Sequence, residues 1–164
     1  MTLMGCKKTE NKPHKAAKTA KTDKDKAWAA FSEMIRVRDC LRTTGVPFVG
    51  VCITCDKKYH ARALQAGHCF AGRSNAKLFM RRFVNAQCGM CNLYKNGKAK
   101  KYERIMRERF SDKYVDRAIY HMNRNISDRN IDWNGRAERY KRLTSIMLRA
   151  HGYKTWREML DNEQ

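Results

Sequence analysis

The chain has 164 residues, with 36 Lys and Arg against 16 Asp and Glu, and a net charge of +20 at pH 7. This length is typical of one domain with appended segments, and such a basic chain attracts polyanions, of which DNA and RNA are the commonest. A basic structural protein is an alternative that charge alone leaves open. No apolar run approaches the roughly 20 residues of a membrane span, and the N-terminus lacks a secretory apolar segment, so we expect no membrane partner.

The charge is unevenly distributed and divides the chain into three parts. Residues 7–26 contain eight lysines and no large apolar side chain. We therefore predict a disordered basic arm over 1–26, either a solvated tail or an arm along a phosphate backbone. Residues 27–101 hold 14 Lys and Arg against three acids, whereas 102–164 hold 14 against ten. This bias indicates that the polyanion-binding module is 27–101, with a helical C-terminal region at 102–164.

The first half of the chain is predicted to contain one long helix and two strands. Apolar side chains recur at helical spacing from about residue 25 to residue 42. Gly45-Val46-Pro47 should end this helix. Apolar, β-prone residues predict strands at 48–53 and 64–70, and a loop follows at 71–75.

The second half is predicted to be mainly helical. Residues 85–95 should lead through a cysteine pair into a short helix that Asn96-Gly97 end. From Lys100 onward, apolar and aromatic residues recur at helical spacing, interrupted by a polar stretch at 123–134 and ended near Gly152 before a last short helix. We interpret these stripes as core packing, so the predicted fold class is α+β.

Two Cys-x-x-Cys pairs predict a metal site. They are formed by Cys52, Cys55, Cys88 and Cys91. Each pair presents two thiolates to one side of an ion, and four soft ligands suit tetrahedral Zn²⁺. Because protein fills all four positions, this zinc should be structural. A redox role is disfavoured, since redox pairs occur singly. Cys6, Cys40 and Cys69 are expected to be free thiols.

His68 lies between the two cysteine pairs, and Asn92 directly follows the second pair. A histidine can act as a general base near neutral pH, and a hard cation with few protein ligands can neutralise a phosphate. His68 on a strand and Asn92 at a helix start could therefore serve metal-assisted phosphodiester hydrolysis. A hydrogen-bonded structural histidine is the alternative.

Several motifs between residues 27 and 117 resemble the NinG (Rap) family of phage recombination nucleases, a zinc-bearing branch of the HNH, or ββα-metal, endonucleases. The resemblance rests on the order C-x-x-C, Gln65-Ala66-Gly67-His68, Gln87-Cys88-x-x-Cys91-Asn92 and Gly97. The phage resolvase endonuclease VII is similar locally. The resemblance implies a zinc-stapled HNH-like module at 27–101 that cuts branched recombination intermediates such as Holliday junctions, in the cytoplasm of a bacterial host.

The resemblance also implies roles for individual residues. His68 would be the general base, and His68 and Asn92 would hold the catalytic Mg²⁺ or Mn²⁺. The chain departs from the pattern where HNH enzymes often carry Asp or His before the base, because Gly67 stands there. Gln65 occupies a position where some relatives have Asp, and Asn85 is the candidate for the middle Asn of HNH.

DNA, in particular branched DNA, is the expected partner. The candidate phosphate-binding residues lie between the histidine and the second cysteine pair: Arg73, Lys77, Arg81 and Arg82. A homodimer through the C-terminal helices is expected, because junction resolution needs two cuts. Two other functions stay open: a non-catalytic zinc-stabilised nucleic-acid-binding protein, and an HNH nicking enzyme with a site preference.

Overall fold

The computed structural model describes residues 21–72, 74–124, 127 and 131–162. Most of the predicted basic arm, and Arg73, lie outside these residues. The helical elements are α1 (Asp23–Thr44), α2 (Asn75–Leu78), α3 (Ala99–Phe110), α4 (Asp112–Met122), α5 (Trp133–Arg149) and α6 (Trp156–Asn162). Short helical turns are η1 (Ala61–Ala63), η2 (Met90–Tyr94) and η3 (Asn96–Lys98). The strands are β1 (Val49–Val51), β2 (Lys58–His60), β3 (Leu64–His68) and β4 (Val84–Cys88).

The long helix α1 begins and ends where local sequence chemistry dictates. Thr22 caps its N-terminus in a reciprocal pair of bonds with Asp25, a capping box that satisfies otherwise unpaired backbone N–H groups. Gly45 ends it with a φ of 81°, a left-handed conformation that glycine adopts without strain. The helix predicted at 25–42 is therefore confirmed, with about one more half-turn at each end.

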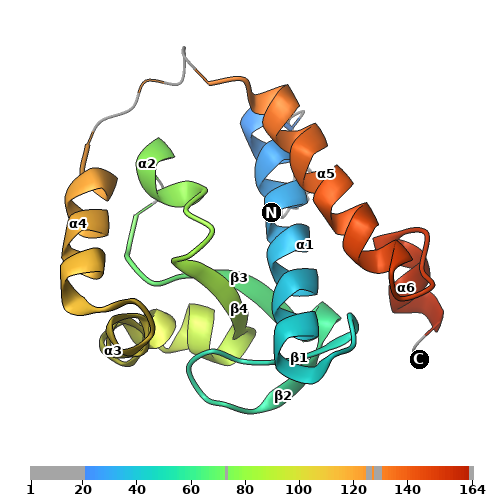
Figure 1. Ribbon diagram of the computed structural model, residues 1–164, viewed down its shortest axis with the longest axis horizontal. Helices are drawn as coiled ribbons and strands as arrows, with labels where there is room; N and C mark the ends of the chain where they lie inside the picture. The colour runs from blue at the N-terminus through green and yellow to red at the C-terminus, as the bar shows by residue number, and fades with distance from the viewer. Residues whose placement is uncertain (1–20, 73, 125–126, 128–130, 163–164) are drawn as a thin grey trace, which may run out of the picture.

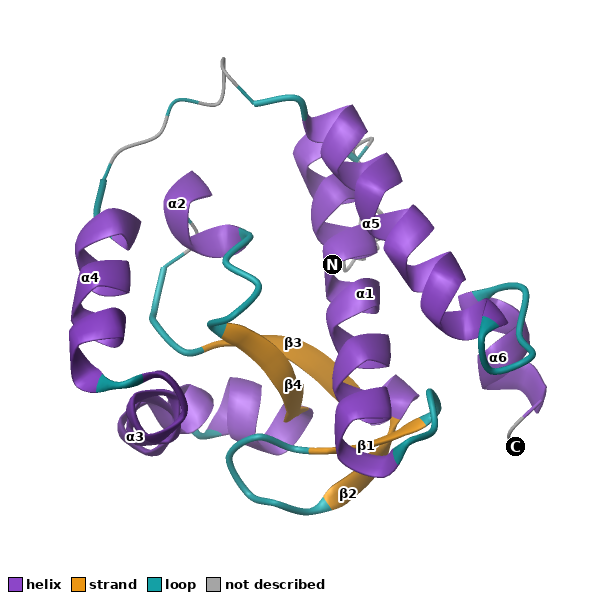
Figure 2. Ribbon diagram, in the orientation of Figure 1, coloured by secondary structure: helices purple, strands orange, loops and turns teal. Residues whose placement is uncertain are grey.

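The strands form two separate antiparallel hairpins, β1 with β2 and β3 with β4. In the second hairpin Gln65 lies opposite Gln87, and Gly67 lies opposite Asn85. Figures 1 and 2 show α1 crossing the hairpins, with α5 alongside α1 and with α3 and α4 on the other side of β3–β4. The predicted mixture of helices and small sheets is confirmed.

The β3–β4 hairpin is covered on both faces. Ala66 and Val84 pack with the apolar face of α1. On the opposite face the buried Tyr102 of α3 donates a hydrogen bond to the carbonyl oxygen of Gly67 at 3.1 Å. A hairpin held between two helices gives fixed positions to the side chains at its ends, which include His68 and Cys88. Within the described residues, none of the helices has the length and apolar character needed to cross a membrane.

Candidate active site

Four cysteines that lie far apart in the sequence converge on one point. The sulfur atoms of Cys52, Cys55, Cys88 and Cys91 all lie within 4.8 Å of one another. The Sγ atoms of Cys55 and Cys88 are 3.9 Å apart, far beyond the roughly 2.05 Å of a disulfide. Tetrahedral Zn²⁺ with Zn–S bonds of about 2.3 Å has sulfur atoms about 3.8 Å apart. The predicted cluster is confirmed: these four thiols can hold one metal ion, and zinc fits the set.

Hydrogen bonds prepare one of these thiols to ionise. Burial would raise the pKa of Cys52, but the Thr54 hydroxyl and the backbone N–H groups of Cys88 and Thr54 bond to its sulfur and lower that pKa to about 6. In contrast, burial raises the pKa of the Cys91 thiol to about 11. A bound cation favours thiolates, so metal binding at this cluster releases protons.

His68 occupies the last position of β3 and is held on two sides. Its ring stacks on Trp28 of α1, with centroids 5.1 Å apart and planes inclined by 17°. Its Nε2 atom lies 3.2 Å from the carbonyl oxygen of Leu78, at the end of α2. A carbonyl can only accept, so Nε2 carries the proton, and the basic lone pair of the neutral ring is on Nδ1. Leu78 thereby fixes both the tautomer and the orientation of the imidazole.

Asn92 lies on the same cleft as His68. This cleft has a volume of about 350 Å³. Its lining comprises His68, Cys69, Phe70, Ala71, Gly72, Asn92, Asn96, Gly97 and Ala99. Asn92 follows Cys91 inside η2, so the cysteine cluster fixes its position. Its Nδ2 atom donates to Oε1 of Gln65 at 2.7 Å, which leaves the Oδ1 carbonyl as the group that Asn92 can offer to a cation. Gln65 therefore orients Asn92.

Packing explains why a glycine, Gly67, precedes His68. A Cβ atom on Gly67 would lie 2.1 Å from Oε1 of Gln87, which is fully buried on β4. The Gln87 amide is held in place because its Nε2 donates to Thr54 at 3.1 Å and to the Gly97 carbonyl at 2.7 Å. The space that an acidic side chain would need at position 67 is thus filled by Gln87.

Asn85 lies away from the cleft of His68. It is buried, and its Nδ2 donates to the Tyr102 hydroxyl at 2.9 Å. Its Oδ1 accepts from Arg42 at 3.0 Å and from Arg38 and Arg109 at 3.4 Å. The structure therefore brings together three of the four predicted catalytic residues, His68, Asn92 and Gln65, whereas Asn85 organises a group of arginines.

The predicted DNA-binding residues also lie at two different places in the structure. Lys77 lies near the cleft and donates to the Ala71 carbonyl at 3.1 Å. Arg81 and Arg82 are exposed on the loop that enters β4, and Arg82 bonds to the Tyr114 hydroxyl and lies over its ring. The site residues that sequence analysis missed are Trp28, Leu78 and Gln87. Trp28 falls in the helix predicted from apolar spacing, and nothing in the sequence pairs it or Leu78 with His68.

The fold and the site define a mixed helix-and-sheet protein in which a four-cysteine metal-binding cluster adjoins a cleft with a histidine and an asparagine. Residues 6–144 match the family described as Bacteriophage Lambda NinG protein, and the chain belongs to this family. The predicted family is therefore confirmed. No curated protein and no solved structure matches the chain.

Proposed function

We propose that this protein is a metal-dependent endonuclease that cuts branched DNA intermediates of recombination, Holliday junctions among them. The observation that carries the proposal is the shared cleft of His68 and Asn92 beside the cysteine cluster. Membership of a phage protein family supports it, because phage recombination generates branched DNA, and so does the net charge of +20. The site of action would be the cytoplasm of the bacterial host.

The order of elements supports an HNH-like, or ββα-metal, module. The antiparallel strands β3 and β4 are followed directly by the helical segment η2, and this segment carries Asn92. His68 and Asn92 are the residues that this module would use for catalysis. Structural zinc in the cysteine cluster would tie η2 to the turn that follows β1, which keeps Asn92 at a constant distance from β3.

In the proposed reaction His68 acts as general base. Its Nδ1 takes a proton from the attacking water, and the Leu78 carbonyl stabilises the resulting imidazolium through the Nε2–H bond. Asn92 would hold a divalent cation through Oδ1, and Gln65 would keep that amide in the correct rotation. A bound Mg²⁺ or Mn²⁺ supplies charge stabilisation for the phosphate and the departing oxygen.

A non-catalytic, zinc-stabilised nucleic-acid-binding protein is the second candidate. One observation favours it: no Asp or Glu lies among the residues that line this cleft in the described part of the chain. A site of neutral amides binds a hard dication more weakly than a carboxylate does. A homodimer and a site-specific nicking activity stay predictions.

The test is cleavage of a labelled four-way junction and of a matching linear duplex, with Mg²⁺ and with EDTA. His68→Ala should lower the cleavage rate by about 10²–10⁴-fold. Metal content, thermal unfolding and junction affinity should stay close to those of the wild type. The matched control is His151→Ala, because His151 is exposed beyond the end of α5 and lies outside the cleft.

Two results would contradict the proposal. Junction cleavage by His68→Ala at the wild-type rate would remove His68 from catalysis. Absence of cleavage by the metal-loaded wild type, with tight junction binding, would identify the second candidate as the function.

A further inference from the structure

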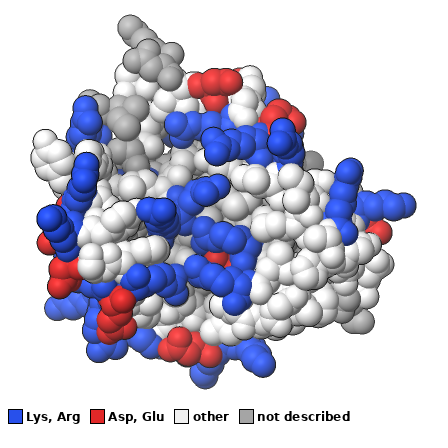
Figure 3. Space-filling model, viewed as in Figure 1, with Lys and Arg blue, Asp and Glu red and all other residues white. Residues whose placement is uncertain are grey.

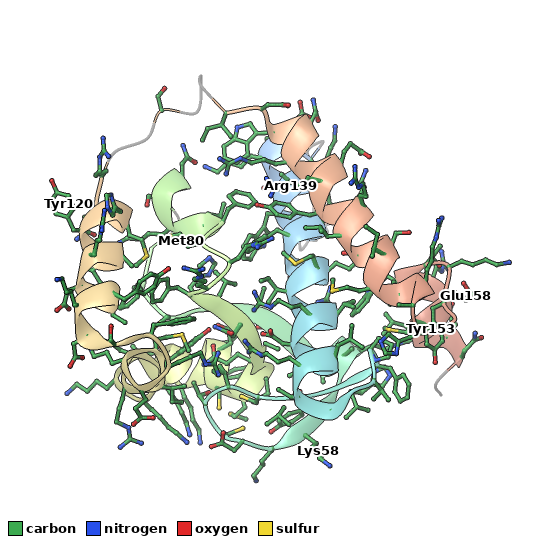
Figure 4. The ribbon with its side chains drawn as sticks, in the orientation of Figure 1. Lys58, Met80, Tyr120, Arg139, Tyr153 and Glu158 are labelled. Carbon is green, nitrogen blue, oxygen red and sulfur yellow. The ribbon has the colours of Figure 1, made fainter. Side chains whose placement is uncertain are left out.

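A second concave site lies away from the cleft of His68. It is a pocket of about 300 Å³ bordered by α1, α5, the start of β4 and the end of α3. We call it the arginine pocket, and its lining comprises Met34, Arg38, Arg42, Arg81, Arg82, Asn85, Phe110, Leu143, Ile146 and Met147. Figure 3 shows Lys and Arg gathered on this face of the molecule between α1 and α4. Met80 and Arg139, both labelled in Figure 4, border an adjoining hollow that shares Arg81 and Arg82.

Two of these arginines are held rigidly before any ligand arrives. Arg38 donates from Nε to Asp39 at 2.7 Å, from Nη1 to the Arg81 carbonyl at 2.7 Å and from Nη2 to the Val84 carbonyl at 2.9 Å. Arg42 reaches Asp39 at 3.3 Å. Because these side chains already have one geometry, an anion that binds them does not have to order them first.

The positive charge around the pocket exceeds its compensation. Arg38 and Arg42 share the buried carboxylate of Asp39, whose side chain is 2% exposed. Arg109 adds a further cation, within 3.4 Å of Asn85. Burial and the charge of Arg42 lower the pKa of the Arg109 guanidinium, while Asp39 opposes this change. Like charges packed this closely repel one another, and a bound anion removes that repulsion.

One wall of the pocket is apolar. The side chains of Leu143, Ile146 and Met147 on α5 face it together with Phe110 and Met34. Ile146 is 55% exposed, so part of this apolar wall is open to a ligand. A ligand that fits this site carries an anionic group next to a flat apolar one. A nucleotide has both, whereas the phosphate backbone of a stacked duplex offers only the first.

We propose that the arginine pocket holds one unstacked nucleotide of a DNA strand, with its phosphate on Arg38 and Arg42 and its base against the apolar wall formed by Leu143, Ile146 and Met147. This inference rests on the proposed function in taking DNA as the ligand. It adds a reason for branch selectivity, since a branch point exposes unpaired nucleotides that a linear duplex keeps stacked. Asn85, which was predicted to be catalytic, would serve here by fixing the guanidinium groups of Arg42 and Arg109.

The test measures binding in EDTA, so that it is independent of cleavage. The ligands are a fluorescently labelled single strand of thymidines and a strand of equal length with abasic sites. The full-length wild type should bind the thymidine strand about threefold to tenfold more tightly. Ile146→Ser should abolish this preference and change the affinity for the abasic strand little. Tyr120→Ser is the matched control, because Tyr120 is 71% exposed on α4 (Figure 4) and does not line the pocket.

The proposed contact of the phosphate with Arg42 is tested by the affinity for both strands and by its dependence on salt. Arg42→Gln should weaken binding of both strands and reduce the slope of log affinity against log salt by about 0.7. Arg81→Gln, at an exposed position of the pocket mouth, should act in the same direction if Arg42→Gln proves unstable. Arg149→Gln is the control, since Arg149 is exposed on α5 and does not line the pocket.

Three outcomes would contradict the proposal. Equal wild-type affinity for the two strands, or a preference that survives in Ile146→Ser, would exclude a nucleotide in the pocket. Stronger displacement of the strand by a peptide of alternating Glu and Leu than by unlabelled thymidine strand would identify a protein ligand. If the wild type cuts no junction but prefers the thymidine strand, the pocket stands and only the nuclease proposal fails.

Discussion

Replacing the buried carboxylate of Asp39 by an amide should destabilise the whole protein. Asp39 is buried, and both of its oxygens accept hydrogen bonds. Oδ1 accepts from Arg38 at 2.7 Å and lies 3.3 Å from Arg42 Nη2, while Oδ2 accepts from the backbone N–H of Ala86 at 2.6 Å. In Asp39→Asn one oxygen becomes an NH₂ group, which must then face either the arginines or the Ala86 N–H.

The magnitude follows from these contacts. Removing the charge of a buried carboxylate from an ion pair costs up to about 3–5 kcal/mol, because the arginine charges lose their compensation and the Ala86 N–H loses its acceptor. Domains of this kind unfold with a free energy of about 5–15 kcal/mol, so the loss is a large share of the total. The surface pair of Arg62 and Asp161 provides the contrast, since its side chains are 45% and 56% exposed at 2.9 Å. Asp161→Asn should therefore cost less than about 1 kcal/mol.

The assay is equilibrium unfolding in urea at 25 °C, followed by tryptophan fluorescence in zinc-containing buffer. With a slope of about 2 kcal/mol/M, Asp39→Asn should lower the unfolding midpoint by about 1.5–2.5 M. Asp161→Asn should lower it by less than about 0.5 M. A shift for Asp39→Asn no larger than that of Asp161→Asn would refute the view that this carboxylate compensates the arginines.

Three further predictions concern the metal cluster and the cleft. Elemental analysis should find about one zinc per wild-type chain, and Cys88→Ser should lose both the zinc and the fold, whereas Cys69→Ala should keep them. Gly67→Ala should lower the free energy of unfolding by about 1–3 kcal/mol through its clash with Gln87, and equal stability of this variant and Gly89→Ala would count against that packing. Gln65→Asp should lower the Mg²⁺ concentration for half-maximal junction cleavage, and an unchanged or higher requirement would mean that position 65 does not serve the cation.

Local signals made much of the framework predictable. Apolar spacing and Gly45 indicated the extent of α1, and the spacing of the cysteines identified the metal cluster because a Cys-x-x-Cys turn has only a few conformations. The family was recognisable because several short motifs occur in a fixed order. The strands β2 and β4 and the helix α2 were missed. Three or four residues give too little periodicity to read in β2 and α2, and β4 was interpreted only as the segment that leads into the second cysteine pair.

Contacts between distant segments were not predictable in the same way. Trp28 falls in the predicted first helix, but its stack on His68 depends on how α1 crosses β3, which no local pattern encodes. Asn85 was assigned to catalysis by its place in a motif. Val84, its neighbour on β4, pairs with His68, and successive positions on a strand face opposite sides of a hairpin. The side chain of Asn85 therefore points away from His68, to Tyr102 and the arginines.

The packing of α1 against α5 has a consequence for the newly made protein. The ring of Phe31 lies 5.0 Å from that of Tyr140, and Phe79 lies 5.3 Å from Trp133. A chain that has left the ribosome only as far as α4 contains the hairpins, His68 and the cysteines, but the aromatic core behind Trp28 lacks its second wall. The aromatic core around Trp28 therefore cannot finish folding before α5 has been synthesised. If the protein has the proposed nuclease function, we expect the growing chain to be unable to cut DNA until α5 has emerged.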